Sequence, residues 1–323
     1  MALNKMVQIA IKAISTKDIN VKKNYKAVRK VINMTHPAYR RPNYHIWDHK
    51  VMNQEVEIPV RIFTVDKKIR PVLIFFHGGG WVTGNIDSYN RVCSNLAKLT
   101  GHVVVSVDYR LAPEYKFPAA PEDCYYVARE IIQNSKEFFG VEPDEVTLIG
   151  DSAGANLAAV VSLMARDRKE FKVSKQILVY PAVNNDFTEQ SVYPSIRENG
   201  TDYFLTSKRL CDYMDLYQSS PKDRENPYFA PILANDLSNQ PKSLVITAEF
   251  DPLRDEGEAY AKKLASFGND VELHRIPDVL HGFFTLSLKL PAVMGCYKLI
   301  SRFLNEFDVG GNIQDAVQEV EKK

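Results

Sequence analysis

Hydrophobic and polar positions alternate in blocks along most of the chain, and these blocks have the lengths of strands and helices. Continuous apolar runs such as residues 71–76 are long enough to form strands buried on both faces. Longer segments between them have apolar residues at helical spacing. The pattern predicts strands near residues 45–52, 57–65, 71–77, 102–109, 146–151, 176–182, 243–250 and 271–276. It predicts helices near residues 87–100, 119–137, 153–167, 256–267 and 292–307. Because strands and helices alternate after residue 70, we expect an α/β fold with a mostly parallel central sheet flanked by helices.

Composition adds constraints on partners and location. The chain has 323 residues, a net charge of +1 and a pI near 7.6, so its charge gives no reason to expect nucleic acid or an acidic membrane as partner. The four cysteines are widely spaced and form no zinc pattern. No apolar stretch approaches the roughly 20 residues that span a bilayer. We therefore expect a cytoplasmic protein without stable membrane insertion, either a monomer or a homodimer.

The segment Gly150-Asp151-Ser152-Ala153-Gly154 carries the clearest chemical signal. It stands between a predicted strand and a predicted helix, which is the setting of a nucleophile elbow. Glycines permit the sharp turn that exposes the Ser152 hydroxyl. The backbone N–H of Ala153, at the helix start, points toward the reacting centre. We expect Asp151 to be a supporting hydrogen-bond partner and not a second catalytic acid.

A second signal is the glycine run that follows the predicted strand at residues 71–77. In His77-Gly78-Gly79-Gly80-Trp81, the glycines leave backbone N–H groups unshielded, as an oxyanion hole for acyl transfer requires. A phosphate-binding loop is the alternative, but neither of its usual glycine patterns is present. The sequence does not decide which of Gly78, Gly79 and Gly80 donate.

The partners of Ser152 are expected downstream, in the order Ser, acid, His that hydrolases of this fold use. We favour His281, because it lies in a loop after a predicted strand, over His274, which lies inside that strand. For the acid we favour Asp251, at the end of the strand near residues 243–250. Asp255 and Glu256 are the alternatives, but they begin the next helix, where acids commonly balance the helix dipole.

Taken together, the motifs resemble those of the hormone-sensitive-lipase branch of the α/β-hydrolase carboxylesterases. The resemblance covers about residues 45–305 and implies a catalytic α/β core, a helical cap, and hydrolysis of short- to medium-chain acyl esters through an acyl-enzyme intermediate. The machinery implies no metal and no cofactor. The resemblance rests on five motifs, which are His77-Gly78-Gly79-Gly80-Trp81, Asp108-Tyr109-Arg110-Leu111-Ala112-Pro113-Glu114, Gly150-Asp151-Ser152-Ala153-Gly154, Asp251-Pro252-Leu253-Arg254-Asp255-Glu256-Gly257 and His281-Gly282-Phe283.

The cap defines the expected organisation of the chain. Residues 184–242 lie between two predicted strands and are not needed by the sheet, and the apolar stripe Leu3, Val7, Ala10 and Ile14 has helical spacing. Residues 18–30 are rich in basic side chains and are expected to form a solvated helix face. The expected parts are N-terminal cap helices 1–45, a first core part 46–183, a cap insertion 184–242, a second core part 243–309 and a mobile tail 310–323.

The substrate is expected to be a small-molecule ester held by aromatic side chains, with Trp81, Tyr203, Phe204 and Phe284 as candidates. An amide hydrolase of the arylformamidase or peptidase type would use the same triad. A ligand-binding receptor of the same fold is a further alternative. It is disfavoured because Ser152, Asp251 and His281 are all present.

Overall fold

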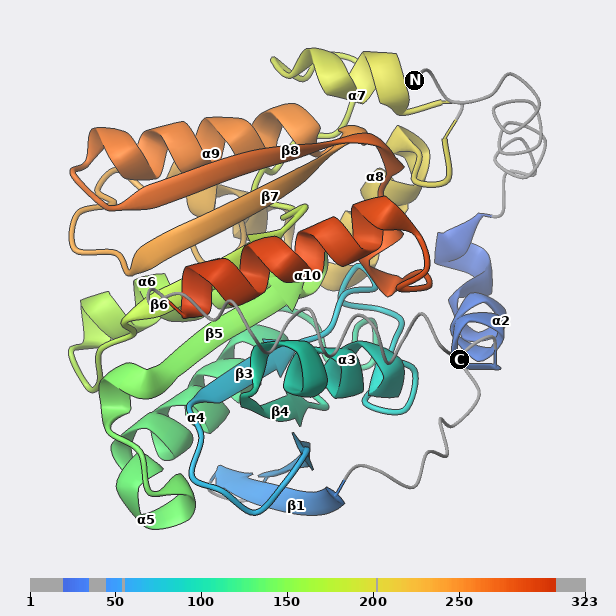
Figure 1. Ribbon diagram of the computed structural model, residues 1–323. Helices are drawn as coiled ribbons and strands as arrows, with labels where there is room; N and C mark the ends of the chain where they lie inside the picture. Colours follow the sequence, from blue (N-terminus) through green and yellow to red (C-terminus); the bar gives the residue numbers. More distant parts are fainter. Residues whose placement is uncertain (1–19, 35–44, 54–55, 202, 306–323) are drawn as a thin grey trace.

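The central sheet contains eight strands within the residues that the computed structural model describes, which are 20–34, 45–53, 56–201 and 203–305 (Figure 1). The strand order is β1-β2-β4-β3-β5-β6-β7-β8. The pairs β1–β2 and β2–β4 are antiparallel, and the other pairs are parallel, which confirms the expected α/β-hydrolase sheet. The strands are β1 (His45–Asn53), β2 (Val56–Thr64), β3 (Val72–Phe76), β4 (Val103–Val107), β5 (Val146–Asp151), β6 (Lys175–Val179), β7 (Lys242–Phe250) and β8 (Val271–Leu280).

Helices cover both faces of this sheet, since alternate residues of each central strand point to opposite faces. Ile74 of β3 belongs to one hydrophobic cluster, with residues of α4, α6 and α9, and Phe75 belongs to a second cluster, with residues of α3 and α10. Figure 1 shows α3 and α10 in front of the sheet and α4 and α6 behind it. The bounds are α3 (Asn90–Thr100), α4 (Ala119–Gln133), α5 (Ser135–Phe139), η1 (Pro143–Glu145), α6 (Ala153–Arg168), α9 (Arg254–Ser266), η4 (Phe283–Thr285) and α10 (Pro291–Leu304).

Several element boundaries differ from the sequence-based prediction by one to three residues, and two elements differ more clearly. The expected helix 119–137 is divided at Asn134 into α4 and α5. Strand β8 runs to Leu280 and not to residue 276, with a shift in its register against β7 between Ala248 and Phe250. This last part of the strand was not predicted because it contains Pro277 and Asp278, two residue types that are uncommon in strands, and Asp278 has a positive φ of 58°.

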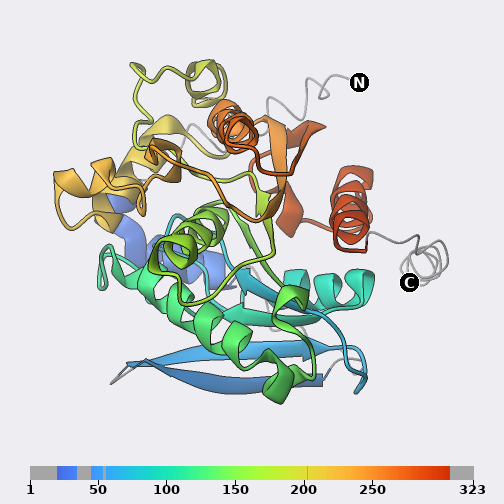
Figure 2. The same cartoon turned by 90° about the vertical axis from the view of Figure 1, so that its left-hand side faces the viewer.

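The segment between β6 and β7 forms helices of its own: α7 (Pro194–Asn199), α8 (Ser207–Tyr217), η2 (Pro221–Glu225) and η3 (Pro231–Leu233). The N-terminal helix α2 (Val21–Met34) lies against α8 (Figure 2). The Val21 N–H donates to Asp212 Oδ2 at 3.0 Å, and Lys22 Nζ donates to Asp215 Oδ2 at 2.8 Å. The stripe from Leu3 to Ile14 and residues 310–323 lie outside the described part of the chain.

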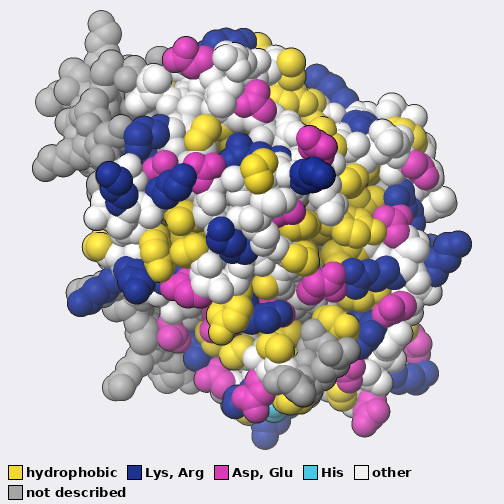
Figure 3. Space-filling model, turned by 180° about the vertical axis from the view of Figure 1, so that it is seen from behind, with side chains coloured by type: hydrophobic (Ala, Val, Ile, Leu, Met, Phe, Trp, Pro, Cys, Tyr) yellow, Lys and Arg dark blue, Asp and Glu magenta, His cyan; other side chains and the backbone are white. Residues whose placement is uncertain are grey.

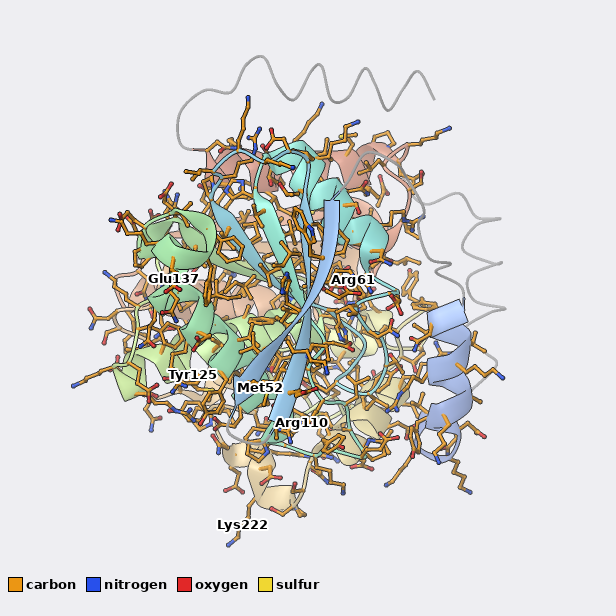
Figure 4. All side chains as sticks on the ribbon, turned by 90° about the horizontal axis from the view of Figure 1, so that it is seen from below. Met52, Arg61, Arg110, Tyr125, Glu137 and Lys222 are labelled. Atoms are coloured by element: carbon orange, nitrogen blue, oxygen red, sulfur yellow. The ribbon has the colours of Figure 1, made fainter. Side chains whose placement is uncertain are left out.

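The edge of the sheet is joined to the helical layer through one arginine of β2. The Arg61 guanidinium donates to Asp48 on β1 at 2.6 and 3.0 Å, to Asp87 at 2.6 Å and to Asn90 of α3 at 3.0 Å. Figure 4 shows Arg61 on the β1–β2 pair, with the exposed Met52 farther along β1. Acidic and basic side chains are interspersed on the face seen in Figure 3, in keeping with the net charge of +1.

Candidate active site

The predicted elbow is present as a strand–turn–helix junction. Strand β5 ends at Asp151, Ser152 has φ 54° and ψ −119°, and α6 begins at Ala153. A Cβ on Gly150 would lie 2.3 Å from the Gly154 carbonyl group, and a Cβ on Gly154 would lie 2.0 Å from the Phe76 carbonyl oxygen. Both positions therefore require glycine, and the turn holds Ser152 in a backbone conformation that non-glycine residues seldom adopt.

The side chains of Ser152, Asp251 and His281 form a continuous chain of hydrogen bonds. His281 Nε2 lies 2.9 Å from Ser152 Oγ, and His281 Nδ1 lies 2.7 Å from Asp251 Oδ2. The imidazole is 10% exposed and the carboxylate is fully buried. The other carboxylate oxygen of Asp251, Oδ1, accepts a hydrogen bond from the Leu253 N–H at 2.9 Å. The three side chains come from the carboxyl ends of β5, β7 and β8, where a parallel sheet places its functional groups.

The alternative acids are engaged elsewhere. Asp255 Oδ2 accepts the Ser195 N–H at 2.7 Å and Asp255 Oδ1 accepts from Arg254 at 2.8 Å. Glu256 Oε1 accepts the Val183 N–H at 2.8 Å, and burial raises the pKa of Glu256 well above its ordinary value. These contacts join the start of α9 to the loop after β6 and to α7.

The alternative histidine, His274, and the nearby Asp278 have other hydrogen-bond partners than the triad. His274 lies within β8, with Nε2 3.4 Å from Glu272 Oε2. Asp278 is exposed to solvent, and its N–H donates to Glu249 Oε2 at 2.7 Å. His281, directly after β8, is the histidine that reaches Ser152.

The glycine run after β3 forms a tight loop. Gly79, Gly80 and Trp81 have φ values of 118°, 61° and 58°. The carbonyl oxygen of Gly79 accepts the N–H groups of Val82 at 3.2 Å and Thr83 at 2.9 Å. A Cβ on Gly79 would lie 2.2 Å from the Thr83 carbonyl oxygen, so only glycine fits there.

Only part of this run is free to act as an oxyanion hole. The Gly78 N–H donates to Asp151 Oδ1 at 2.8 Å and lies 3.1 Å from the Tyr89 hydroxyl. The candidate donors are thereby narrowed to the N–H groups of Gly79, Gly80 and Ala153. Ala153 also has the positive end of the α6 dipole behind it.

Asp151 is the centre of a buried polar cluster that the sequence indicated only in part. Its Oδ2 accepts the hydroxyls of Tyr89 at 3.0 Å and Tyr180 at 3.2 Å, and the Tyr180 ring lies 4.6 Å from the His281 ring. Burial raises the pKa of Asp151 to about 6, against the opposing effect of the Tyr89 and Gly78 hydrogen bonds. Tyr180 directly follows β6, so its position at the carboxyl edge of the sheet is the signal that could have identified it.

The four aromatic candidates occupy different environments. Trp81 is 3% exposed and stacks on Tyr217 of α8 with ring centroids 4.4 Å apart. Phe284 is fully buried in the α3–α10 cluster, where it stacks on Tyr297 at 4.6 Å. Both side chains are packed within the hydrophobic clusters, and a contact of either with the substrate stays a prediction.

The other two candidates belong to the segment between β6 and β7. Tyr203 stacks on Phe250, next to Asp251, with centroids 5.5 Å apart, whereas Phe204 is 55% exposed. A further aromatic residue, Tyr213 of α8, lies against the glycine run after β3, since a Cβ on Gly80 would come within 2.6 Å of its ring.

Within the described ranges, no three His, Cys, Asp or Glu side chains are grouped closely enough to hold a metal ion. In the same part of the chain, no helix combines the length and apolar character needed to cross a bilayer.

Comparison with known proteins shows the family to which the chain belongs. A family model described as alpha/beta hydrolase fold matches residues 73–285, and the chain belongs to this family. It is 41% identical over 241 residues to an arylesterase of Saccharolobus solfataricus, covering 73% of this chain and 76% of that protein. It is 35% identical over 241 residues to the carboxylesterase NlhH of Mycobacterium tuberculosis, covering 73% and 74%.

A solved structure supports the same assignment over nearly the whole chain. The hyperthermophilic esterase from Pyrobaculum calidifontis superposes with a TM-score of 0.83 at 37% identity, covering 95% of this chain and 99% of that one. The resemblance to hormone-sensitive-lipase-like carboxylesterases is thus confirmed.

Proposed function

We propose that this protein is a serine carboxylesterase that hydrolyses short- to medium-chain acyl esters. The hydrogen-bonded chain from Asp251 through His281 to Ser152 is the observation that carries the proposal. A nucleophile beside a base that is itself oriented by a third group is the arrangement that acyl transfer requires. The esterase names of the relatives support the same reaction class.

The first half of the reaction acylates the enzyme. With Nδ1 of His281 donating its proton to Asp251 Oδ2, Nε2 is free to accept the Ser152 proton as Oγ attacks the ester carbonyl carbon. The negative charge that develops on the carbonyl oxygen is stabilised by the N–H groups of Gly79, Gly80 and Ala153. The imidazolium then returns its proton to the departing alcohol, and an acyl-Ser152 ester remains.

The second half regenerates the enzyme. His281 Nε2 accepts a proton from a water molecule as the water oxygen attacks the acyl carbon, and the same oxyanion hole stabilises the new tetrahedral intermediate. Proton return to Ser152 Oγ releases the carboxylic acid. Asp251 stays ionised throughout, because its task is to orient the imidazole and stabilise the imidazolium.

The cap is assigned to residues 184–242 together with the N-terminal helices, above a core made of residues 46–183 and 243–309. The contacts of α2 with α8 and the stacking of Tyr217 on Trp81 support this division. Tyr203 and Tyr213 are the aromatic side chains that we place nearest the substrate, because one stacks beside Asp251 and the other lies on Gly80.

The decisive experiment is a series of nitrophenyl esters from acetate to laurate, assayed beside the matching nitroanilides. We expect ester hydrolysis to peak at roughly C2 to C6 and anilide hydrolysis to be much slower. Anilide turnover equal to ester turnover would favour an amide hydrolase, and stoichiometric binding without turnover of either would favour a receptor.

We further place the protein in the cytoplasm, as a monomer or homodimer. The four cysteines Cys93, Cys124, Cys211 and Cys296 are free thiols, as a reducing compartment favours. Size-exclusion chromatography with light scattering would measure the oligomeric state.

A further inference from the structure

The side chain of Arg29 joins three segments that lie far apart in the sequence. From α2, its Nε donates to the Val82 carbonyl oxygen at 2.7 Å and its Nη2 donates to the Ala112 carbonyl oxygen at 2.9 Å. The same guanidinium makes two bonds to the Glu114 carboxylate, at 3.1 and 2.9 Å. The side chain is 22% exposed, so the described part of the basic segment, residues 20–30, is not simply the solvated helix face that its composition predicts.

The loop that Arg29 holds is the one that carries the candidate oxyanion donors. Val82 is fully buried, and its N–H closes the turn onto the Gly79 carbonyl oxygen. The Ala112 N–H donates to the Trp81 carbonyl oxygen at 2.9 Å, so the second segment that Arg29 contacts is bonded to the same loop. The orientation of the Gly79 and Gly80 peptide groups depends on this turn, because three successive residues have positive φ values.

The helix that carries Arg29 also contacts the segment 184–242, at residues that precede the non-helical backbone of Asn24. Helix α2 lies on α8 through Val21 and Lys22, which bond to Asp212 and Asp215. A continuous set of contacts therefore leads from the segment 184–242, through α2, to the loop beside Ser152.

We propose that Arg29 is a positioning residue for the oxyanion hole: by holding the Val82 and Ala112 carbonyls and Glu114 together, it fixes the direction of the Gly79 and Gly80 N–H groups. The inference rests on the proposed esterase function. Its alternative is a purely structural role, in which Arg29 stabilises the fold without affecting the chemical step. The two differ in where a substitution acts, because a misdirected donor weakens transition-state binding more than substrate binding.

The test compares Arg29→Met and Arg29→Lys with the control Lys22→Met in the full chain. Lys22→Met removes a contact between the same helix and α8 without touching the loop. For each protein, kcat and KM are measured with nitrophenyl butyrate over a range of concentrations. Active sites are titrated first, so that kcat is expressed per active site. The affinity for an alkyl trifluoromethyl ketone is measured in parallel, because its adduct with Ser152 would place an oxyanion in the hole.

For Arg29→Met we expect kcat to fall about 10- to 100-fold while KM changes less than about threefold, and the ketone to bind more weakly by the same factor as kcat. Arg29→Lys can still donate to Val82 but cannot bridge all three partners. Its kcat and its affinity for the ketone should therefore also fall, but by a smaller factor than in Arg29→Met. Lys22→Met should keep kcat within about twofold, as an exposed ion pair contributes little.

A lower melting temperature with wild-type kcat and ketone affinity per active site, in Arg29→Met or in Arg29→Lys if the former does not fold, would overturn the inference. An equal loss of kcat in Lys22→Met would also overturn it, by showing a general loosening of α2. Wild-type enzyme that neither hydrolyses the ester nor binds the ketone would instead overturn the proposed function.

Discussion

The backbone N–H of Gly78 donates a hydrogen bond of 2.8 Å to Oδ1 of Asp151. This bond joins the loop after β3 to the last residue of the strand that presents the nucleophile. It also assigns different tasks to three consecutive glycines, because the N–H of Gly78 is used to hold the loop in place. The donors to the substrate oxygen from this run are therefore expected to be the N–H groups of Gly79 and Gly80, which act together with that of Ala153.

The first prediction concerns the nucleophile. Ser152→Ala should lower kcat by about 10⁴-fold or more, because the group that attacks the carbonyl is absent. Folding should be retained, since the turn depends on Gly150 and Gly154 and not on the serine hydroxyl. Ester hydrolysis and circular dichroism would be measured on the same sample. A purified variant with substantial activity would refute the mechanism.

A second prediction distinguishes the acids at the start of α9. Asp251→Asn should lower kcat by about 10³-fold or more, because an amide favours the wrong tautomer and orientation of His281. Asp255→Asn should change kcat less than about tenfold, since Asp255 bonds Ser195 and Arg254. Steady-state kinetics of both variants would check the ranking, and the reverse order would move the triad acid to Asp255.

Asp151 should make the stability of the protein depend on pH. Its pKa is raised from 3.8 to about 6 by burial, so the native state binds the proton more tightly than the unfolded chain does. The resulting stabilisation is fully present below about pH 4 and is lost as the pH rises through about 6. The free energy of unfolding of the wild type, minus that of Asp151→Asn, should therefore decrease between pH 4 and 7, by about 3 kcal/mol at most.

Urea denaturation of the two proteins across this range would measure the difference. Glu256, whose pKa is also raised by burial, is present in both proteins, so its own contribution cancels. A difference that stays constant from pH 4 to 7 would contradict the raised pKa of Asp151.

The acyl-chain preference should respond to the aromatic side chains of the segment between β6 and β7. Tyr203→Ala should shift the preferred ester to a longer acyl chain, because Tyr203 stacks on Phe250 beside Asp251 and its loss leaves volume for methylene groups. Each methylene that fits contributes about 1 to 3 kcal/mol of discrimination. Phe204→Ala should shift the preference less, since Phe204 is 55% exposed. An unchanged acyl-chain-length profile in both variants would contradict the placement of this segment at the substrate pocket.

The strands and the triad could be predicted from sequence because their signals are local. All five residues of β3 and of β4 are buried, so each strand stands out as an apolar run. The elbow motif is recognisable within one pentapeptide, although the steric need for Gly154 comes from Phe76 of β3. By contrast, the polar end of β8 and the break at Asn134 left no clear mark in the hydrophobic pattern.

What the sequence could not supply are contacts between distant segments. Arg29 reaches Val82 across 53 positions, and nothing in its neighbourhood distinguishes it from the other basic residues of α2. The packing partners of Trp81 and Phe284 could likewise not be predicted, because they are side chains of separate helices, Tyr217 of α8 and Tyr297 of α10.

The separation of 129 positions between Ser152 and His281 has a consequence for the folding of the chain. No fragment that ends before β8 contains the imidazole, and β8 occupies the edge of the sheet, paired only with β7 within the described strands. Contacts between such distant positions carry a high loop-closure cost and tend to form late. During refolding, helical circular dichroism should therefore recover before hydrolytic competence, and the regain of turnover would time the docking of the last strand.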